Sequence, residues 1–217
     1  MSNLDFVKFA LEPFDYTNER KQKIFIVEGP DGTGKTTVCN FLSKLYDLPI
    51  IHLIYYEKQE DMDKQYERVF QLIHALIHNN GAVNRGLIFD RFTSSNRVYS
   101  GVFKNSKVSP WTIKIETLIQ IMSSYYNITF INCLPKDKQE YLNRYKDIAS
   151  LRDELYGDDL ENMGKVYDEY KVIFSAEKLS YNDDIKKVDY DYLEQRDTLN
   201  IDSLIKENFN NEKSTSN

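Results

Sequence analysis

The feature that most constrains this chain is a glycine-rich loop between an apolar run and a helical pattern. The run at 23–28 is rich in β-forming residues, and apolar side chains recur at helical spacing after position 37. A strand, a glycine loop and a helix in this order predict a loop that binds phosphate groups. The loop reads Gly29-Pro30-Asp31-Gly32-Thr33-Gly34-Lys35-Thr36-Thr37 and fits the pattern G-x-x-x-x-G-K-[ST].

Each part of this loop has a physical task. The glycines let the backbone turn tightly and aim its N–H groups inward, and the following helix N-terminus adds the positive end of its dipole. Lys35 can reach the β- and γ-phosphates of a nucleotide, and the hydroxyl of Thr36 can coordinate Mg²⁺. We therefore expect the whole segment from Gly29 to Thr37 to bind ATP, with Mg²⁺ as the required metal.

The rest of the chain alternates apolar runs with helical patterns. Strands are predicted at about 22–28, 49–55, 86–90, 128–134 and 185–190. Helices are predicted at about 35–46, 61–79, 92–103, 110–122, 136–147, 159–180 and 198–208. This alternation predicts an α/β fold of the P-loop NTPase type, in which a five-stranded parallel sheet forms the middle of three α/β/α layers. In such a fold the ligand binds at the carboxyl ends of the strands.

Length and composition exclude several classes of protein. The 217 residues, with 41% apolar and 29% charged side chains, suit one folded domain at about 21–208, between an N-terminal extension (1–20) and a disordered tail (209–217). The net charge of −6 argues against a broad nucleic-acid-binding face. No run approaches the roughly 18 apolar residues of a membrane span, and no secretory signal is evident. We expect a cytoplasmic protein without membrane contact, in the host cytoplasm if its AT-rich type of composition reflects a phage.

A second motif follows the third predicted strand. Asp90 ends that strand, and Arg91 comes directly after it. An acid at the end of a strand beside the P-loop strand can hold Mg²⁺. An arginine beside it points into the crevice where phosphates lie, and a guanidinium matches a phosphate bidentately. The sequence therefore predicts a metal ligand at Asp90 and a catalytic phosphate contact at Arg91.

Together the two motifs resemble those of the thymidylate kinase family and the related deoxynucleoside kinases. The segment 28–37 is similar to the family's loop E-G-x-D-G-x-G-K-[ST]-T, and the segment 90–101 is similar to D-R-[YFH]-x-x-S-x-x-A-[YF]-x-G. The layout agrees over about 22–208, although only these two motifs are specific. The resemblance implies phosphoryl transfer from ATP to a deoxynucleoside monophosphate, with dTMP as the expected acceptor and dTDP as the product.

The resemblance also implies roles for single residues at the acceptor. Asp31 would bind the 3′-hydroxyl of the acceptor sugar, and Arg91 would bind the acceptor phosphate or the phosphoryl group in transit. Ser95 and Tyr99 would line the acceptor pocket, while Lys35 and the loop amides hold the phosphates of ATP.

Recognition of the base rests on a separate helix. In the family, a Phe on this helix stacks on thymine and an Arg four residues later binds it; Phe70 and His74 have this spacing. Packing of the same aromatic stripe against a neighbouring helix or a second subunit is the favoured alternative, because aromatic stripes pack more often than they contact a ligand. Ser100 stands where many members have a Gln that reads thymine, and the family's R-E-P-G-type loop is missing after the second predicted strand.

A lid is expected at about 143–157, because a kinase must exclude water from the phosphoryl group. Family members with Gly at the loop position held by Gly32 usually carry their catalytic arginine in this lid. The resemblance therefore implies that Arg144 and Arg152 are catalytic. A solvated charged helix remains the alternative for each of them.

Two other functions stay open. A deoxynucleoside kinase acting on a 5′-hydroxyl would need a base, for which Glu57 and Asp90 are candidates. A regulator that holds a nucleotide without turnover would bind ATP and form no product. The partners expected in every case are small nucleotides. Because family members are commonly homodimers, the resemblance also makes a homodimer an expectation.

Overall fold

The computed structural model describes residues 22–56, 58–78, 86–103, 107–152, 160–180 and 185–192. The predicted N-terminal extension, the final helix at 198–208, the tail and Glu57 lie outside these residues. Among the helices that the structure does describe, none is long and apolar enough to cross a membrane.

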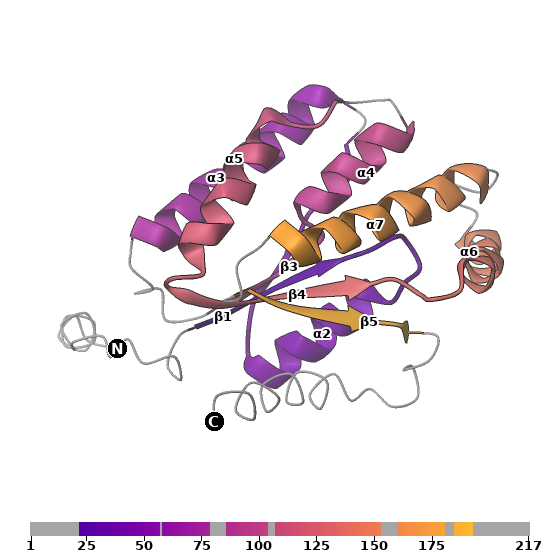
Figure 1. Ribbon diagram of the computed structural model, residues 1–217, viewed down its shortest axis with the longest axis horizontal. Helices are drawn as coiled ribbons and strands as arrows, with labels where there is room; N and C mark the ends of the chain where they lie inside the picture. Colours follow the sequence, from indigo (N-terminus) through magenta and orange to yellow (C-terminus); the bar gives the residue numbers. More distant parts are fainter. Residues whose placement is uncertain are drawn as a thin grey trace.

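Within the described residues, five parallel strands form one sheet in the order β2-β3-β1-β4-β5, as Figure 1 shows. Val27 of the central strand β1 lies opposite Asp90 of β3 and Ile131 of β4. The glycine loop that follows β1 therefore leaves the middle of the sheet at its carboxyl edge. The strands are β1 (Gln22–Glu28), β2 (Ile50–His52), β3 (Leu87–Asp90), β4 (Tyr126–Cys133) and β5 (Lys186–Tyr190).

Helices cover both faces of this sheet. Helix α2 (Lys35–Tyr46) lies on one face, and four others lie on the opposite face, while α6 lies beyond the carboxyl ends of the strands (Figure 1). The predicted three-layer α/β/α fold with a five-stranded parallel sheet is therefore confirmed. The remaining helices are α3 (Gln59–His78), α4 (Thr93–Phe103), α5 (Pro110–Met122), α6 (Lys138–Arg152) and α7 (Leu160–Ser180).

The alternation of β1 builds two separate cores. Ile24 and Ile26 point into a cluster with α3 and α5, whereas Phe25 and Val27 point into a cluster with α2. All four side chains are almost fully buried, so both faces of β1 are apolar. The next position on the first face is Glu28, which puts a carboxyl group at the base of the loop.

Two local features fix the start of α5 and the segment that follows β2. Ser109 caps α5, since its side chain accepts a hydrogen bond from the backbone N–H of Trp111, and Pro110 occupies the first helical position, where proline is favoured. The second strand is shorter than the predicted run at 49–55, because it ends at His52. Beyond it, the side-chain amide of Gln65 on α3 bonds both the N–H and the C=O of Ile54, at 3.1 and 2.9 Å. Gln65 of α3 therefore satisfies the backbone groups of Ile54 that a longer strand β2 would have paired within the sheet.

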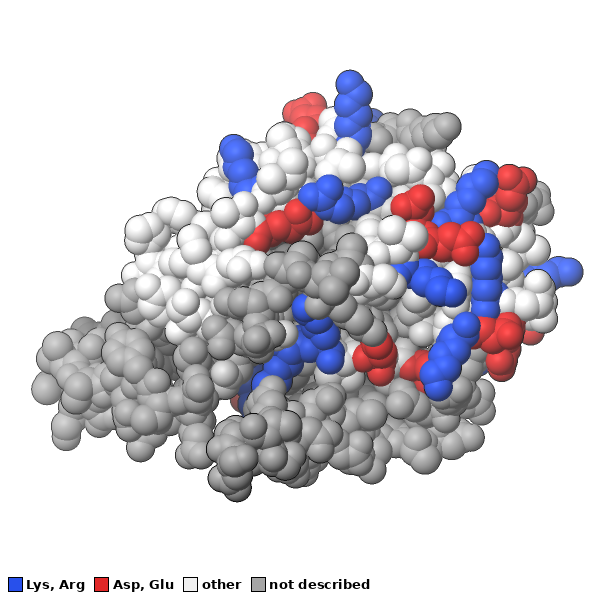
Figure 2. Space-filling model, in the orientation of Figure 1, with Lys and Arg blue, Asp and Glu red and all other residues white. Residues whose placement is uncertain are grey.

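Charged side chains of both signs are interspersed on the face that Figure 2 shows, including the side of α6 and α7. Lys138 of α6 pairs with Asp168 of α7 at 2.6 Å, and Lys165 pairs with Glu161 at 2.8 Å. The absence of a broad nucleic-acid-binding face remains a prediction.

Candidate active site

The glycine loop folds back on the carbonyl of Pro30. The Nζ of Lys35 and the hydroxyl of Thr33 both donate to this oxygen, the latter at 2.8 Å. Gly34, with φ of 80°, is the N-cap of α2, so Lys35 and Thr36 occupy the first positions of the helix. This arrangement aims the free N–H groups of the first helical turn at the centre of the loop, where an anion binds.

Gly29 is required by close approach as well as by its φ of 147°. A Cβ at this position would lie 2.1 Å from the carbonyl oxygen of Cys133 on β4. We expect Gly29→Ala to lower the free energy of unfolding by about 3 kcal/mol or more, as strain at a special backbone position does. Urea denaturation followed by circular dichroism measures this.

Gly101→Ala is the matched control, because a Cβ there meets nothing within 4 Å and the residue lies in α4. It should raise the free energy of unfolding by up to about 1 kcal/mol through helix propensity. Equal effects of the two substitutions would contradict the close-approach argument.

The structure brings Arg91 onto the glycine loop. Its guanidinium pairs with the carboxylate of Asp31 and lies over the ring of Tyr99, 5.1 Å from the ring centroid. The Tyr99 hydroxyl donates to the other oxygen of Asp31 at 2.9 Å, and the Nζ of Lys35 lies 4.0 Å from Asp31 Oδ1. Burial alone would raise the pKa of Asp31, but Arg91 and Lys35 together hold it below its usual value. Two cations therefore converge on one carboxylate in the loop.

The backbone at Arg91 is held in an unusual conformation. Its φ is 71°, in the left-handed region that residues other than glycine seldom adopt. The N–H of Arg91 donates to the carbonyl of Val27 at 2.9 Å, and the N–H of Leu53 donates to the carbonyl of Asp90 at 3.0 Å. Hydrogen bonds on both sides of β3 thus hold the strained backbone at Arg91. This backbone directs the guanidinium toward the glycine loop.

Lys35 lies in an environment that opposes its charge. Burial and then the positive charge of Arg91 lower the pKa of Lys35 to about 8. A bound triphosphate favours the ammonium form, so the affinity for ATP should fall about tenfold between pH 7 and pH 9. Isothermal titration calorimetry at these pH values measures this, with Lys35→Met as the variant whose profile should stay flat over this range.

The free energy of unfolding of the unliganded protein should rise with pH, whereas the affinity for ATP falls. Between about pH 8 and about pH 10 the unfolded chain still holds the Lys35 proton that the folded protein has released, so the free energy of unfolding rises with pH. An affinity for ATP that did not change from pH 7 to pH 9 would contradict the lowered pKa.

The two predicted metal ligands offer oxygen atoms of the kind that Mg²⁺ prefers. Thr36 is exposed at the start of α2, and Asp90 is mostly buried at the end of β3. The Oδ2 of Asp90 lies 2.9 Å from the Nδ1 of His52, a partner that the sequence motifs did not indicate although it ends the neighbouring strand. Among the described residues, no group of three or more His, Cys, Asp or Glu side chains gathers around one point. A hydroxyl and a carboxylate therefore fit Mg²⁺ held mainly through nucleotide phosphates, rather than a site built from protein ligands alone.

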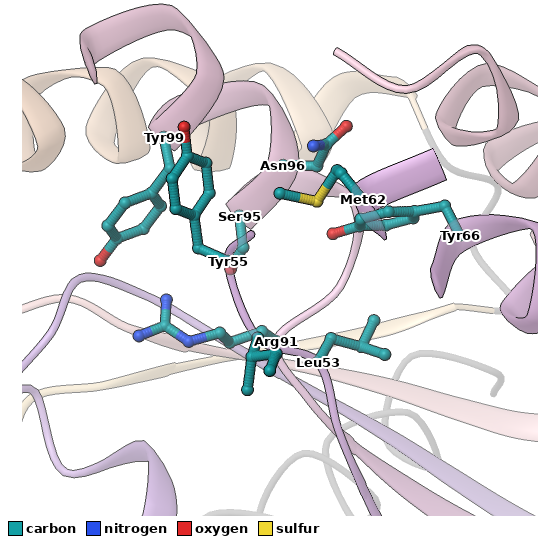
Figure 3. A pocket seen from close by; sticks show the side chains of 9 residues that line it. Leu53, Tyr55, Met62, Tyr66, Arg91, Ser95, Asn96 and Tyr99 are labelled. Carbon is teal, nitrogen blue, oxygen red and sulfur yellow. The ribbon is translucent and has the colours of Figure 1, made fainter. Parts of the chain in front are cut away.

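A cavity opens beside Arg91, and Figure 3 shows its two ends. The guanidinium of Arg91 and the ring of Tyr99 lie at one end, and Met62 and Tyr66 of α3 lie at the other (Figure 3). The free volume is about 10 Å³, the space of roughly one water molecule, so a ligand enters only when a side chain moves. The lining residues are Leu53, Ile54, Tyr55, Met62, Tyr66, Arg91, Ser95, Asn96 and Tyr99.

Two predicted base-binding residues lie elsewhere on α3. Phe70 is half-buried and packs on Trp111 of α5, with ring centroids 5.0 Å apart. His74 is exposed and stacks on Phe70 at 6.0 Å. The residues that α3 brings to the cavity are Met62 and Tyr66, which come earlier in the helix. The contacts of Phe70 are therefore those of helix packing, the alternative to base binding.

The predicted acceptor residue Ser95 lines the cavity, but its polar groups are engaged. Its N–H donates to Glu28 Oε1 at 3.1 Å, its hydroxyl donates to Glu28 Oε2, and the same hydroxyl lies 2.8 Å from that of Tyr170 on α7. Glu28 is fully buried, and burial raises its pKa. Ser100 is not among the lining residues; its hydroxyl accepts a hydrogen bond from Asn96 Nδ2 at 3.3 Å. The sequence showed Glu28 as the charged end of an apolar strand and as the first residue of the loop motif, but gave no sign of its contacts with Ser95 and Tyr170.

The two predicted lid arginines both lie on α6. Arg144 lies on α6 with its guanidinium over the ring of Tyr192, 3.8 Å from the centroid. Tyr192 in turn packs on the loop, since its Cβ would lie 3.3 Å from a Cβ at Gly34. Arg152 ends α6, but its side chain lies outside the described part, as does the rest of the predicted lid after this helix.

Comparison with known proteins supports the fold. No family model matches the sequence, and no curated protein matches it. The chain is similar to YorR from Bacillus subtilis, solved in complex with phosphorylated GDP, with 21% identity over 77% of this chain and 85% of that chain and a TM-score of 0.53. It also shows a weaker likeness to the deoxyadenosine kinase from M. mycoides with bound dCTP, at 16% identity over 89% of this chain and 100% of that chain, with a TM-score of 0.45. This chain therefore has an α/β fold like that of YorR.

Proposed function

We propose that this chain is an ATP- and Mg²⁺-dependent kinase of a deoxynucleoside monophosphate, with dTMP as the acceptor. The observation that carries the proposal is the Arg91 guanidinium, held on Asp31 of the glycine loop and facing the neighbouring cavity. A loop for the donor phosphates and a guanidinium for a second phosphate are thereby placed side by side. Phosphoryl transfer between two nucleotides needs this juxtaposition.

The cavity supports an acceptor with a phosphate at one end and an apolar ring at the other. The acceptor phosphate would replace Asp31 as the partner of Arg91, which leaves the Asp31 carboxylate available for a sugar hydroxyl. The opposite end offers Leu53, Met62 and Tyr66. Apolar contact of this kind favours the methyl group of thymine by roughly tenfold over an unmethylated pyrimidine. Tyr55, whose ring centroid lies 6.0 Å from that of Tyr99, would move aside as the acceptor enters.

The chemistry then needs no strong base, because the acceptor phosphate is already ionised at neutral pH. Lys35 and Arg91 stabilise the charge of the phosphoryl group in transit, and both are positioned before the reaction begins. Mg²⁺, when bound between Thr36, Asp90 and the nucleotide, would neutralise the charge of the β- and γ-phosphates. Arg144 lies on Tyr192 beside Gly34, and this position near the loop supports its role as a lid arginine.

A deoxynucleoside kinase is the second candidate. Glu57, which would be its base, lies outside the described residues. The other candidate base, Asp90, has its Oδ2 engaged with Nδ1 of His52 at 2.9 Å. Arg91 would then bind the γ-phosphate alone.

Product formation by the purified protein tests the proposal. The protein is incubated with Mg²⁺-ATP and either thymidine, dTMP, the other deoxynucleosides or their monophosphates, with Lys35→Ala as the blank, and products are separated by anion-exchange chromatography. Formation of dTDP from dTMP supports the proposal. Formation of a monophosphate from a nucleoside assigns the second candidate, and ATP binding without any product assigns the regulator.

A further inference from the structure

The middle of α6 packs over the glycine loop. A Cβ at Gly32 would lie 3.5 Å from Cδ1 of Ile148 and 4.0 Å from Cδ2 of Tyr145. Tyr145 is buried, and its ring centroid lies 6.3 Å from that of Tyr141, one turn earlier on the same face of the helix. This face of α6 is therefore in contact with the loop that would hold the phosphates.

Tyr141 has a buried hydroxyl without a hydrogen-bond partner among the described residues. The side chain is 2% exposed, and its ring stacks on that of Tyr167 with centroids 5.6 Å apart. The hydroxyl of Tyr167 is satisfied, because it donates to the carbonyl of Pro135 at 2.6 Å. A buried hydroxyl left unpaired costs folding free energy, so a position that keeps one requires a reason.

The surroundings of Tyr141 indicate what its hydroxyl faces. Tyr141 belongs to one apolar cluster with Tyr145 and with Tyr99, whose hydroxyl donates to Asp31 at 2.9 Å. Tyr141 therefore lies in the cluster that borders the pair formed by Asp31 and Arg91, and burial raises its pKa, so its hydroxyl stays protonated at neutral pH. A neutral O–H beside two converging cations is a hydrogen-bond donor for an anion.

We propose that Tyr141 is a further catalytic residue, whose hydroxyl donates a hydrogen bond to a phosphate oxygen between donor and acceptor. No bond to the tyrosine forms or breaks, and the proton stays on the phenol; the hydrogen bond stabilises charge in the transition state. The ligand class is a nucleotide phosphate chain, so this inference rests on the proposed function. The lid helix would then contribute a neutral donor from its first turn in addition to Arg144.

Removal of a single oxygen tests the proposal. Tyr141→Phe should lower kcat/KM about 10- to 100-fold, the loss expected for a hydrogen bond to a charged group, without lowering the Tm. Tyr167→Phe is the matched control from the same aromatic cluster: it should lower the Tm and leave kcat/KM within about twofold of the wild type, because its hydroxyl donates to the backbone carbonyls of Pro135 and Lys136.

Binding of inorganic tripolyphosphate separates this inference from the proposed function. Calorimetry should show about tenfold weaker binding to Tyr141→Phe than to the wild type. If the wild type phosphorylated no acceptor, the proposed function would fail, and the tripolyphosphate affinities would still decide the role of Tyr141. Affinity and kcat/KM both within twofold of the wild type would overturn the proposal, as would a loss of Tm equal to that of Tyr167→Phe.

Discussion

Replacing Arg91 by alanine is expected to lower kcat/KM about 1,000-fold or more, the range found for arginines that act on a phosphoryl group in transit. The variant loses the guanidinium that would bind the acceptor phosphate. It also removes one of the two cations beside the Asp31 carboxylate, which increases the repulsion between this carboxylate and the incoming anion. Steady-state kinetics with dTMP and Mg²⁺-ATP measure the effect, and calorimetry should show ATP affinity within about threefold of the wild type.

Two variants define what Arg91 contributes. Arg91→Lys keeps the charge but lacks the planar fork, so its kcat/KM should lie between those of the wild type and the alanine variant. Arg97→Ala is the control, because Arg97 lies on α4 and already pairs with Glu116 at 2.9 and 2.6 Å. It should leave kcat/KM nearly unchanged. Full activity of Arg91→Ala would show that the acceptor phosphate is held elsewhere.

Lys35→Met is expected to lower kcat about 1,000-fold and, at the same time, to stabilise the unliganded protein. The loss of activity follows because the ammonium is the side-chain cation of the loop itself. The gain in stability follows because Lys35 is 6% exposed and burial lowers its pKa to about 8. Removing a buried charge of this kind should raise the free energy of unfolding by about 1–3 kcal/mol at pH 7. The carbonyl of Pro30 keeps its hydrogen bond from Thr33, so it is not left unpaired.

Urea denaturation at pH 7 and single-turnover kinetics measure the two effects of this substitution. Lys44→Met in the last turn of the same helix is the control, since Lys44 is exposed and should change neither quantity appreciably. A variant that lost both activity and stability would indicate that Lys35 has a structural role rather than one in binding phosphate.

The phosphate-binding part of the site, from β1 to the start of α2, could be predicted from sequence because its residues are neighbours along the chain. The apolar run before the loop and the helical pattern after it set the bounds of β1 and α2, which the structure places at Gln22–Glu28 and Lys35–Tyr46. Strands that alternate with helices form parallel sheets, whose carboxyl ends lie at one edge. Asp90 and the loop were therefore expected together, and the register of Val27 opposite Asp90 confirms it.

The residues that line the acceptor cavity could not be predicted from sequence. They depend on the angle at which α3 packs on the sheet, and the helical periodicity of α3 does not determine this angle. A helical stripe shows which residues share a face, but not which turn of that face lies at the carboxyl edge of the sheet. Gln65 binds the backbone of Ile54 and thereby brings Met62 and Tyr66 to the cavity, while Phe70 packs on Trp111 instead.

The sequence by itself determined the α/β fold, the glycine loop and the placement of Asp90 and Arg91 at a strand end, since each follows from short-range patterns and chain connectivity. Only the tertiary structure decided which partners these residues have. Arg91 meets Asp31, Asp90 meets His52, Glu28 meets Ser95 and Tyr170, and the hydroxyl of Tyr141 is buried near the loop. These contacts join segments far apart in the chain, and their energies depend on burial and distance, which no spacing of residues along a sequence encodes.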